Sequence, residues 1–267
     1  MVDKSEKFRW LVRLGYAARG LVYIVLGYLA LTTASRAEGG GTAVFDTLHD
    51  VPLGTALLWL MAVGLLAYAI FKFLSAAADV QHHGTSAGGL AKRTGDAASA
   101  VAHAVLAFGA FQYASGSDAP PSGPSGGEQA AGMILAMPLG EALVGLVGLG
   151  FLAGAVMQAR SALTGRFMAR VSPAAPAAVR PVGRLGYAAR AVVFVIVGWS
   201  LVQSAWLDSE APVKDLGEAI GALHGGGGPL YTAVALGLLL FGLFSLVVSR
   251  YRIIPDLHAS DLKPGLR

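Results

Sequence analysis

The chain has 267 residues, of which 55% are hydrophobic and only 13% are charged. Soluble domains carry about 25% charged residues, so this composition indicates a protein that is embedded in lipid. The sequence contains no cysteine, which excludes disulfides, thiolate nucleophiles, cysteine-ligated zinc and iron–sulfur clusters. The net charge of +4 does not indicate nucleic-acid binding, because the basic residues lie at the ends of apolar segments.

Six segments have the length and composition of membrane-spanning helices, which need about 20 mainly apolar residues. In chain order they are residues 14–34, 53–77, 97–115, 133–160, 185–207 and 230–250. The third is the least apolar, because Ser99, His103 and Gln112 lie within it. We therefore predict an all-α, polytopic membrane protein with six transmembrane helices.

The basic residues gather on alternate sides of these spans. Of the 20 Lys and Arg residues, 18 lie at the termini or in the second-to-third and fourth-to-fifth connections, and only Arg36 and Lys214 lie on the other side. Ten of the 16 acidic residues have the opposite bias. By the positive-inside rule, we expect an inner-membrane protein whose N- and C-termini are both cytoplasmic.

A short motif reveals internal repeats. Residues 13–19, RLGYAAR, recur unchanged as residues 184–190, and a decayed copy at 93–99 has Asp96 and Ser99 in place of the Tyr and the second Arg. A Pro-Leu pair opens the second helix of each unit, at residues 52–53, 138–139 and 229–230. The predicted organisation is a cytoplasmic segment 1–12, two-helix repeats 13–80, 93–165 and 184–252, and a cytoplasmic tail 253–267.

Each repeat holds an even number of spans, so the three units share one orientation in the membrane. Parallel repeats of this kind are related by an axis along the membrane normal. We therefore expect a pseudo-threefold or arc-like arrangement of helix pairs.

These features resemble a known family. The Arg-x-Gly-Tyr-Ala-x-Arg opening, the proline before each second helix and the threefold repetition are similar to the bacterial membrane proteins grouped as domain of unknown function 1206. The resemblance covers roughly residues 13 to 252. It implies three two-helix repeats and a bacterial membrane location, and it implies no activity.

Arg19 and Arg190 are the leading candidate functional residues. In one interpretation they reach lipid phosphates from the headgroup region, with Tyr16 and Tyr187 as interfacial aromatic residues. In another they converge from two repeats to form a lipid-phosphate or anion site, and in a third they pair with a carboxylate such as Asp96. The candidate residues for lipid or anion binding at the cytoplasmic rim are Arg13, Tyr16, Arg19, Arg184, Tyr187 and Arg190.

Three histidines complete the candidates. His103 lies deep in the third span, where we expect a hydrogen bond across a helix interface; a proton relay or haem ligand is the functional alternative. His49 and His224 precede second helices in similar contexts, and we expect them in short amphipathic segments at the outer face. We expect His49 and His224 to be solvated there and not to bind a metal ion. We therefore predict no metal and no cofactor.

No phosphate-binding loop, dinucleotide fingerprint or nucleophile elbow is present. We therefore predict a non-enzymatic scaffold, accessory subunit or lipid-interacting module. The expected partners are anionic membrane lipids or a second membrane protein, and not nucleic acid. The alternative is a channel or small-solute transporter with its path along the pseudo-threefold axis.

Overall fold

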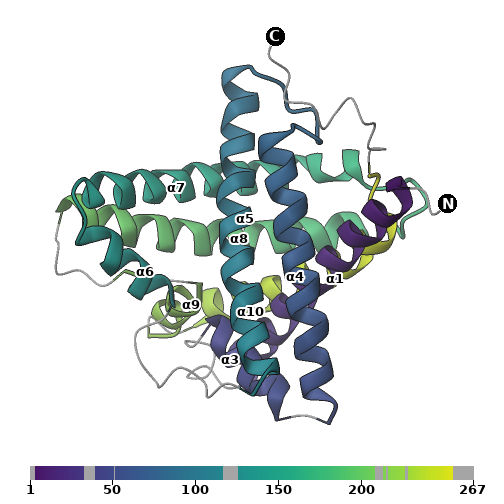
Figure 1. The fold of residues 1–267 in the computed structure, drawn as a ribbon, viewed down its shortest axis with the longest axis horizontal. Coiled ribbons are helices and arrows are strands. Elements are labelled where there is room, and N and C mark those ends of the chain that lie inside the picture. Colours follow the sequence, from purple (N-terminus) through teal and green to yellow (C-terminus); the bar gives the residue numbers. More distant parts are fainter. Residues whose placement is uncertain are drawn as a thin grey trace.

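The computed structural model describes residues 4–32, 40–50, 52–116, 126–207, 213–214, 216–225 and 228–254. Residues 255–267 of the predicted tail and most of the connection after the third span lie outside these ranges. Within them the chain is helical (Figure 1), and six helices are long and apolar enough to cross a membrane. Those six helical spans are Phe8–Thr32, Gly54–Ala77, Ala87–Ala114, Gly140–Thr164, Val179–Leu207 and Pro229–Tyr251.

Each repeat consists of a long helix, a short helix and a second long helix. The first repeat contains α1 (Lys4–Thr32), α3 (Gly40–His49) and α4 (Gly54–Ala77). The middle repeat contains α5 (Ala87–Ala114), α6 (Gly126–Leu135) and α7 (Gly140–Thr164). The third contains α8 (Val179–Val202), which ends in a π-helical turn, η2 (Gln203–Leu207), followed by α9 (Leu216–Gly225) and α10 (Pro229–Tyr251).

Four helices begin well away from the residues predicted for them, and one of these is α8, which starts at Val179 and not at residue 185. Helices α1 and α5 start about ten residues earlier than predicted, at Lys4 and Ala87, because polar turns beyond the apolar window remain helical. The side chain of Ser86 caps α5 by accepting a hydrogen bond from the backbone N–H of Gly89. The fourth span begins later than predicted, because residues 133–135 belong to α6 and not to α7.

The Pro-Leu-Gly sequence that opens α4 and α7 is a backbone turn. Leu53 and Leu139 both have a φ of 65°, which is the left-handed region. A Cβ added at the following Gly54 or Gly140 would lie 1.8 Å from a carbonyl oxygen of the preceding short helix. Only glycine fits at such an approach, so this turn joins each short helix closely to the span that follows.

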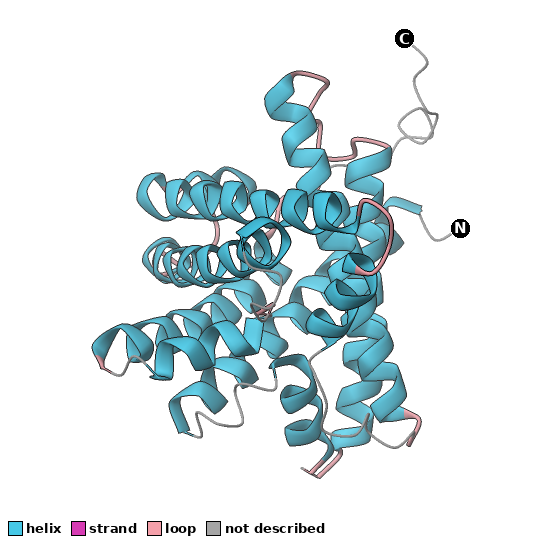
Figure 2. Cartoon of the chain, turned by 90° about the vertical axis from the view of Figure 1, so that its left-hand side faces the viewer, coloured by secondary structure: helices cyan, strands magenta, loops and turns pink. Residues whose placement is uncertain are grey.

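The six spans pack in the order α5–α4–α1–α10–α8–α7, which forms an arc. The second helix of each repeat packs against the first helix of the next, with α10 against α1 completing the series. Within a repeat, α1 packs on α4 and α8 on α10. In Figures 1 and 2 the α4–α5 pair runs crosswise to the α7–α8 pair, so within the described residues α5 and α7 do not pack along one another. The two ends of the arc are therefore the two helices of the middle repeat.

The motif glycine in the first helix of each repeat shows how the middle repeat differs in packing from the other two. A Cβ added at Gly15 would lie 2.7 Å from the Cβ of Tyr68 in α4, and one at Gly186 would lie 2.7 Å from the Cα of Phe241 in α10. Helices approach this closely only where one side contributes a small residue. The equivalent Gly95 of α5 has nothing within 4 Å of an added Cβ.

The second helices show the same difference. An added Cβ at Gly64 would lie 2.5 Å from the Cβ of Ala18, and one at Gly237 would lie 2.4 Å from the Cβ of Ala189. The equivalent Gly150 of α7 has nothing within 4 Å. The middle repeat thus carries both packing glycines without using them, and the side of the arc between α5 and α7 is open.

Candidate functional site

Arg19 lies midway along α1, and its guanidinium group points into the helix bundle. It is only 8% exposed. One terminal nitrogen donates to the hydroxyl of Tyr68 at 2.7 Å and the other donates to the hydroxyl of Ser245 at 3.0 Å. These two partners come from α4 and α10, so Arg19 joins the first repeat to the third.

Arg190 of α8 occupies the equivalent place in the third repeat. Its guanidinium carbon lies 4.9 Å from the ring centre of Phe194 and 5.4 Å from that of Tyr23. With the amide oxygen of Gln158 turned toward it, Arg190 donates to that oxygen at 3.0 and 3.3 Å. Arg190 therefore joins the third repeat to α7 of the middle repeat.

The two arginines converge on one aromatic ring. The guanidinium carbon of Arg19 lies 5.0 Å from the ring centre of Phe241, and that of Arg190 lies 4.5 Å from it. Both distances are within the range of cation–π attraction. Among the described residues no carboxylate bonds to either arginine, and the buried Nε atoms of both have no hydrogen-bond partner. The site therefore holds two positive charges whose described partners are neutral.

A third cation occupies the remaining interface between repeats. Counted from the packing glycines, Lys72 of α4 is the equivalent of Gln158 and Ser245. Its ammonium group lies 2.5 Å from the carboxylate of Asp96 in α5. Each interface between successive repeats thus contains one cation at an equivalent position, buried for Arg19 and half-buried for Lys72 and Arg190. Asp96, which the sequence offered as a partner for Arg19 or Arg190, instead pairs with Lys72.

The arginines that open the motif have a different environment. Arg184 donates through Nε to the carbonyl of Ala162 at the end of α7, at 2.6 Å. Arg93 makes the equivalent bond to the carbonyl of Ala76 in α4, at 2.8 Å. Basic side chains stabilise helix C-termini in this way by satisfying unpaired carbonyl groups. Arg13 instead lies 5.7 Å from the ring of Trp10.

The motif tyrosines lie inside the bundle. Tyr16 is 4% exposed, and the guanidinium carbons of Arg19 and Arg252 each lie 4.7 Å from its ring centre. Tyr187 is half-buried and stacks on Phe167 at 4.9 Å. Neither ring therefore has the lipid-facing position expected of an interfacial aromatic residue, and both contribute to packing around the arginines.

His103 is half-buried and forms its hydrogen bond within its own helix. Because a carbonyl oxygen only accepts, Nδ1 donates to the carbonyl of Ser99, at 2.7 Å. The imidazole ring also lies 4.5 Å from the ring of Tyr68. The predicted bond across a helix interface is replaced by this intrahelical bond, while the contact with Tyr68 does cross from α5 to α4.

His49 and His224 are both exposed near the ends of the short helices α3 and α9, which contact each other. The ring of His224 lies 4.8 Å from that of Tyr231. In the part of the chain that the structure describes, no group of three or more His, Cys, Asp or Glu side chains could hold a metal ion. Their role at the outer face remains a prediction.

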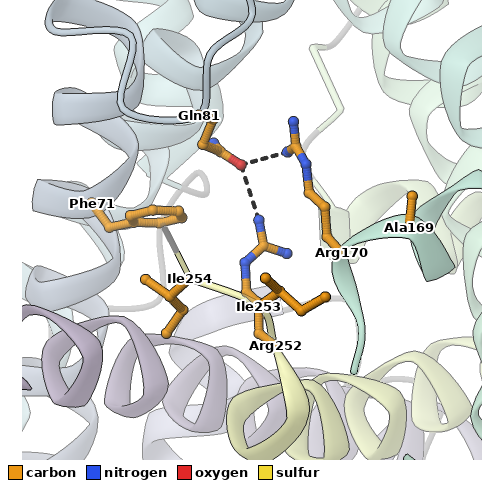
Figure 3. Close-up of a pocket in the computed structure, with 7 residues that line it drawn as sticks. All are labelled: Phe71, Gln81, Ala169, Arg170, Arg252, Ile253 and Ile254. Atoms are coloured by element: carbon orange, nitrogen blue, oxygen red, sulfur yellow. Dashed lines mark hydrogen bonds between the residues drawn. The ribbon is translucent and has the colours of Figure 1, made fainter. Parts of the chain in front are cut away.

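The structure also forms a polar cluster that the sequence did not reveal (Figure 3). Gln81, in the loop between α4 and α5, accepts hydrogen bonds from Arg170 at 2.5 Å and from Arg252 at 2.9 Å. It donates to Asp96 at 3.0 Å, and Nε2 of His83 lies 3.1 Å from the same carboxylate. Only the replacement of the motif tyrosine by Asp96 could have indicated it, because the other residues lie outside the motif.

The loop that carries Gln81 is held by Asp79. Its carboxylate accepts the backbone N–H of His83 at 2.7 Å and that of Gly84 at 2.8 Å. Burial raises the pKa of the Asp79 carboxyl, but these bonds and the charge of Arg93 outweigh burial and lower the pKa below its ordinary value. Burial, together with the charge of Arg170, lowers the pKa of His83, although Asp96 opposes this.

Comparisons with known proteins agree with the repeat organisation. The family model described as Domain of Unknown Function (DUF1206) matches residues 14–79, 94–165 and 185–252. The chain is also similar to the uncharacterized protein YxxB of Bacillus subtilis (strain 168), with 31% identity over 262 residues that cover 93% of this chain and 94% of the relative. No solved structure gives a significant match.

Proposed function

This chain belongs to the Domain of Unknown Function 1206 family, and we propose that it is a non-enzymatic integral membrane protein that binds the phosphate group of an anionic lipid between Arg19 and Arg190. The supporting observation is the convergence of both guanidinium groups on Phe241, with only neutral side chains as their described partners. Among the predicted roles, this favours the lipid-interacting module over the scaffold and the accessory subunit.

A phosphate group suits this site for electrostatic and geometric reasons. A positive charge within a membrane span is costly unless an anion or a set of hydrogen bonds compensates it, and here two such charges share one aromatic ring. The planar guanidinium group donates two parallel hydrogen bonds to phosphate. Anionic lipids supply that phosphate at high local concentration.

The open side of the arc is the proposed route to the arginines. Helices α5 and α7 are the least buried spans, each with 28% of its most apolar stretch buried, whereas the other four spans range from 50% to 61%. The middle repeat has Ser99 where the others have an arginine, so it places no third guanidinium group beside this route. Both helices place a polar side chain close to the cations, His103 on α5 and Gln158 on α7.

The proposed location is the bacterial inner membrane, with both termini in the cytoplasm, as the distribution of basic residues favours. Because the chain contains no cysteine, single cysteines can report the topology. Asp50→Cys and Thr85→Cys are at exposed positions at opposite ends of α4. An impermeant maleimide added to intact spheroplasts should label the first and not the second; the reverse pattern would overturn the orientation.

The alternative of a channel along the pseudo-threefold axis requires a continuous polar path. Between the two arginines and the short helices α3 and α9, the large, fully buried side chains of the spans are apolar. They are Leu26, Leu58, Met61, Leu65, Val193 and Leu238. These side chains do not favour conduction. Anion flux into proteoliposomes tests this alternative directly.

The test of lipid binding compares the native protein with Arg19→Gln/Arg190→Gln after gentle extraction in neutral detergent. Native mass spectrometry should detect anionic lipid retained by the native protein and lost from the double variant. Arg250→Gln, which removes an exposed arginine at the end of α10, is the matched control and should retain the lipid. Circular dichroism establishes that all three proteins are folded.

Equal lipid retention by all three proteins would overturn the proposal. A stoichiometric membrane protein that co-purifies, without anionic lipid, would also overturn it and favour the accessory subunit. Competition by inorganic phosphate, with no effect of lipid composition, would identify a small anion as the ligand.

A further inference from the structure

Arg170 and Arg252 are held side by side by backbone pairing between two distant segments. Arg170 ends the 3₁₀ helix η1 (Arg166–Arg170), and Arg252 follows α10. An antiparallel bridge joins Val171 to Arg252, with the N–H of Ser172 donating to the carbonyl of Tyr251 at 2.8 Å and the N–H of Ile253 donating to that of Arg170 at 3.0 Å. The two side chains are therefore fixed by the fold.

Both guanidinium groups are directed to the same neutral atom. The side-chain oxygen of Gln81 accepts from each of them, at 2.5 and 2.9 Å. An arginine has five N–H donors. Besides the bonds to Gln81, the described hydrogen-bonding contact of the pair is between Arg170 and Nδ1 of His83, at 3.5 Å. Most of their donors therefore have no acceptor within the described part of the protein.

The charge around this pair is unbalanced. The cluster contains the carboxylate of Asp96, which already accepts hydrogen bonds from Lys72 and Gln81 and lies next to Nε2 of His83. Burial lowers the pKa of Arg170, and the neighbouring positive charge of Arg252 lowers it further. An anion placed between the two guanidinium groups would relieve the repulsion between their charges.

A cavity of about 120 Å³ lies beside the two arginines, as Figure 3 shows. Its polar lining is Gln81, Arg170 and Arg252, and its apolar lining is Phe71, Ala169, Ile253 and Ile254. It is formed by α4 and the loop that follows it, by η1 and by the end of α10, so it joins the first and third repeats to the connection that follows the middle repeat. This position is distinct from the Arg19 and Arg190 site, which lies within the spans.

We infer that this cavity binds a phosphate group through Arg170 and Arg252, either as soluble phosphate or as the headgroup phosphate of an anionic lipid. The paired guanidinium groups supply bidentate donors from two sides. The amide oxygen of Gln81 accepts from both arginines and so positions them on one side of the cavity for the anion. Because the ligand would join η1, which directly follows α7, to the end of α10, its binding stabilises the assembled arc.

The test measures thermal unfolding of the full chain in phosphatidylcholine nanodiscs, titrated with inorganic phosphate and, separately, with sodium chloride at the same ionic strength. Phosphate should raise the unfolding temperature beyond the effect of chloride. Arg170→Gln and Arg252→Gln should each weaken the apparent phosphate affinity by about ten- to hundred-fold, since each removes hydrogen bonds to a charged group. Arg166→Gln removes an exposed arginine from the same 3₁₀ helix and should leave the affinity unchanged.

Repeating the titration in nanodiscs that contain phosphatidylglycerol separates the two sources of phosphate. Loss of the response to inorganic phosphate there identifies the lipid headgroup as the ligand, and a retained response identifies soluble phosphate. The inference is overturned if phosphate and chloride have equal effects on the native protein in phosphatidylcholine nanodiscs. It is also overturned if Arg170→Gln and Arg252→Gln, both folded by circular dichroism, have the same phosphate affinity as the native protein and the Arg166→Gln control.

Discussion

Lys72 Nζ lies 2.5 Å from the Oδ1 atom of Asp96, and this ion pair joins the last helix of the first repeat to the first helix of the middle one. The two side chains are 15% and 10% exposed. Asp96 stands where the other repeats have the motif tyrosine. The divergence of the middle repeat therefore replaces an aromatic contact by an electrostatic one.

The first prediction concerns this ion pair. Asp96→Asn leaves the ammonium group of Lys72 largely buried without its carboxylate, and breaking such a pair costs about 3–5 kcal/mol. We expect a clear fall in the unfolding temperature measured in detergent. Lys72→Gln combined with Asp96→Asn should recover part of the loss, while Asp50→Asn, an exposed control, should have little effect. Equal stability of Asp96→Asn and the native protein would contradict the structural role of the pair.

The second prediction tests whether the arc is open. Gly186→Ala forces a Cβ against the backbone of Phe241 and should cost about 1–3 kcal/mol, as overpacking does. Gly95→Ala, at the equivalent position of α5, meets open space and should stabilise the helix by up to about 1 kcal/mol through helix propensity. Thermal unfolding of the two variants in the same detergent compares them directly. Similar destabilisation by both would show that α5 packs against α7 and that the arc closes into a ring.

The third prediction concerns the hydrogen bond from Arg19 to Tyr68. Tyr68→Phe keeps the aromatic ring but removes the hydroxyl that accepts from the guanidinium group, which should cost about 1–3 kcal/mol because a buried donor loses its partner. Tyr28→Phe removes a hydroxyl from a side chain that is 55% exposed and should be neutral. The unfolding midpoint of each variant gives the result, and a neutral Tyr68→Phe would mean that water or another group replaces the hydroxyl.

The fourth prediction concerns acid sensitivity. The pKa of His83 is lowered in the folded protein from its ordinary value of 6.5, so the unfolded chain takes up a proton first as the pH falls. The contribution of His83 to stability is therefore present above pH 6.5 and is lost as the pH falls from there through the folded pKa. His83→Gln should reduce the loss of unfolding temperature between about pH 7 and pH 5, because the group that titrates there is gone.

His82→Gln provides the control for this experiment, because His82 is the adjacent, exposed histidine. Its variant should keep the acid sensitivity of the native protein. If the pH profiles of His83→Gln and His82→Gln coincide, the acid sensitivity comes from other groups.

The sequence by itself determined the six spans and the three repeats, because apolar length and an unchanged seven-residue motif depend only on local composition. It left open whether Arg19 and Arg190 converge, because equivalent positions in parallel repeats face a common axis but arginines near a membrane surface also reach lipid phosphates. It did not determine where α1 and α5 begin, because polar turns outside the hydrocarbon also continue a helix. Nor did it determine where α7 begins, because residues 133–135 belong to the short helix α6.

Only the tertiary structure decided how the repeats are joined. Gly95 and Gly150 match the packing glycines of the other repeats in sequence, yet they have no neighbours, because α4 and α8 hold α5 and α7 at opposite ends of the arc. Gln81, Arg170 and Arg252 are far apart in the chain and belong to no motif. They meet because the backbone bridge between Val171 and Arg252 and the loop after α4 bring them together, and such contacts depend on packing between distant segments.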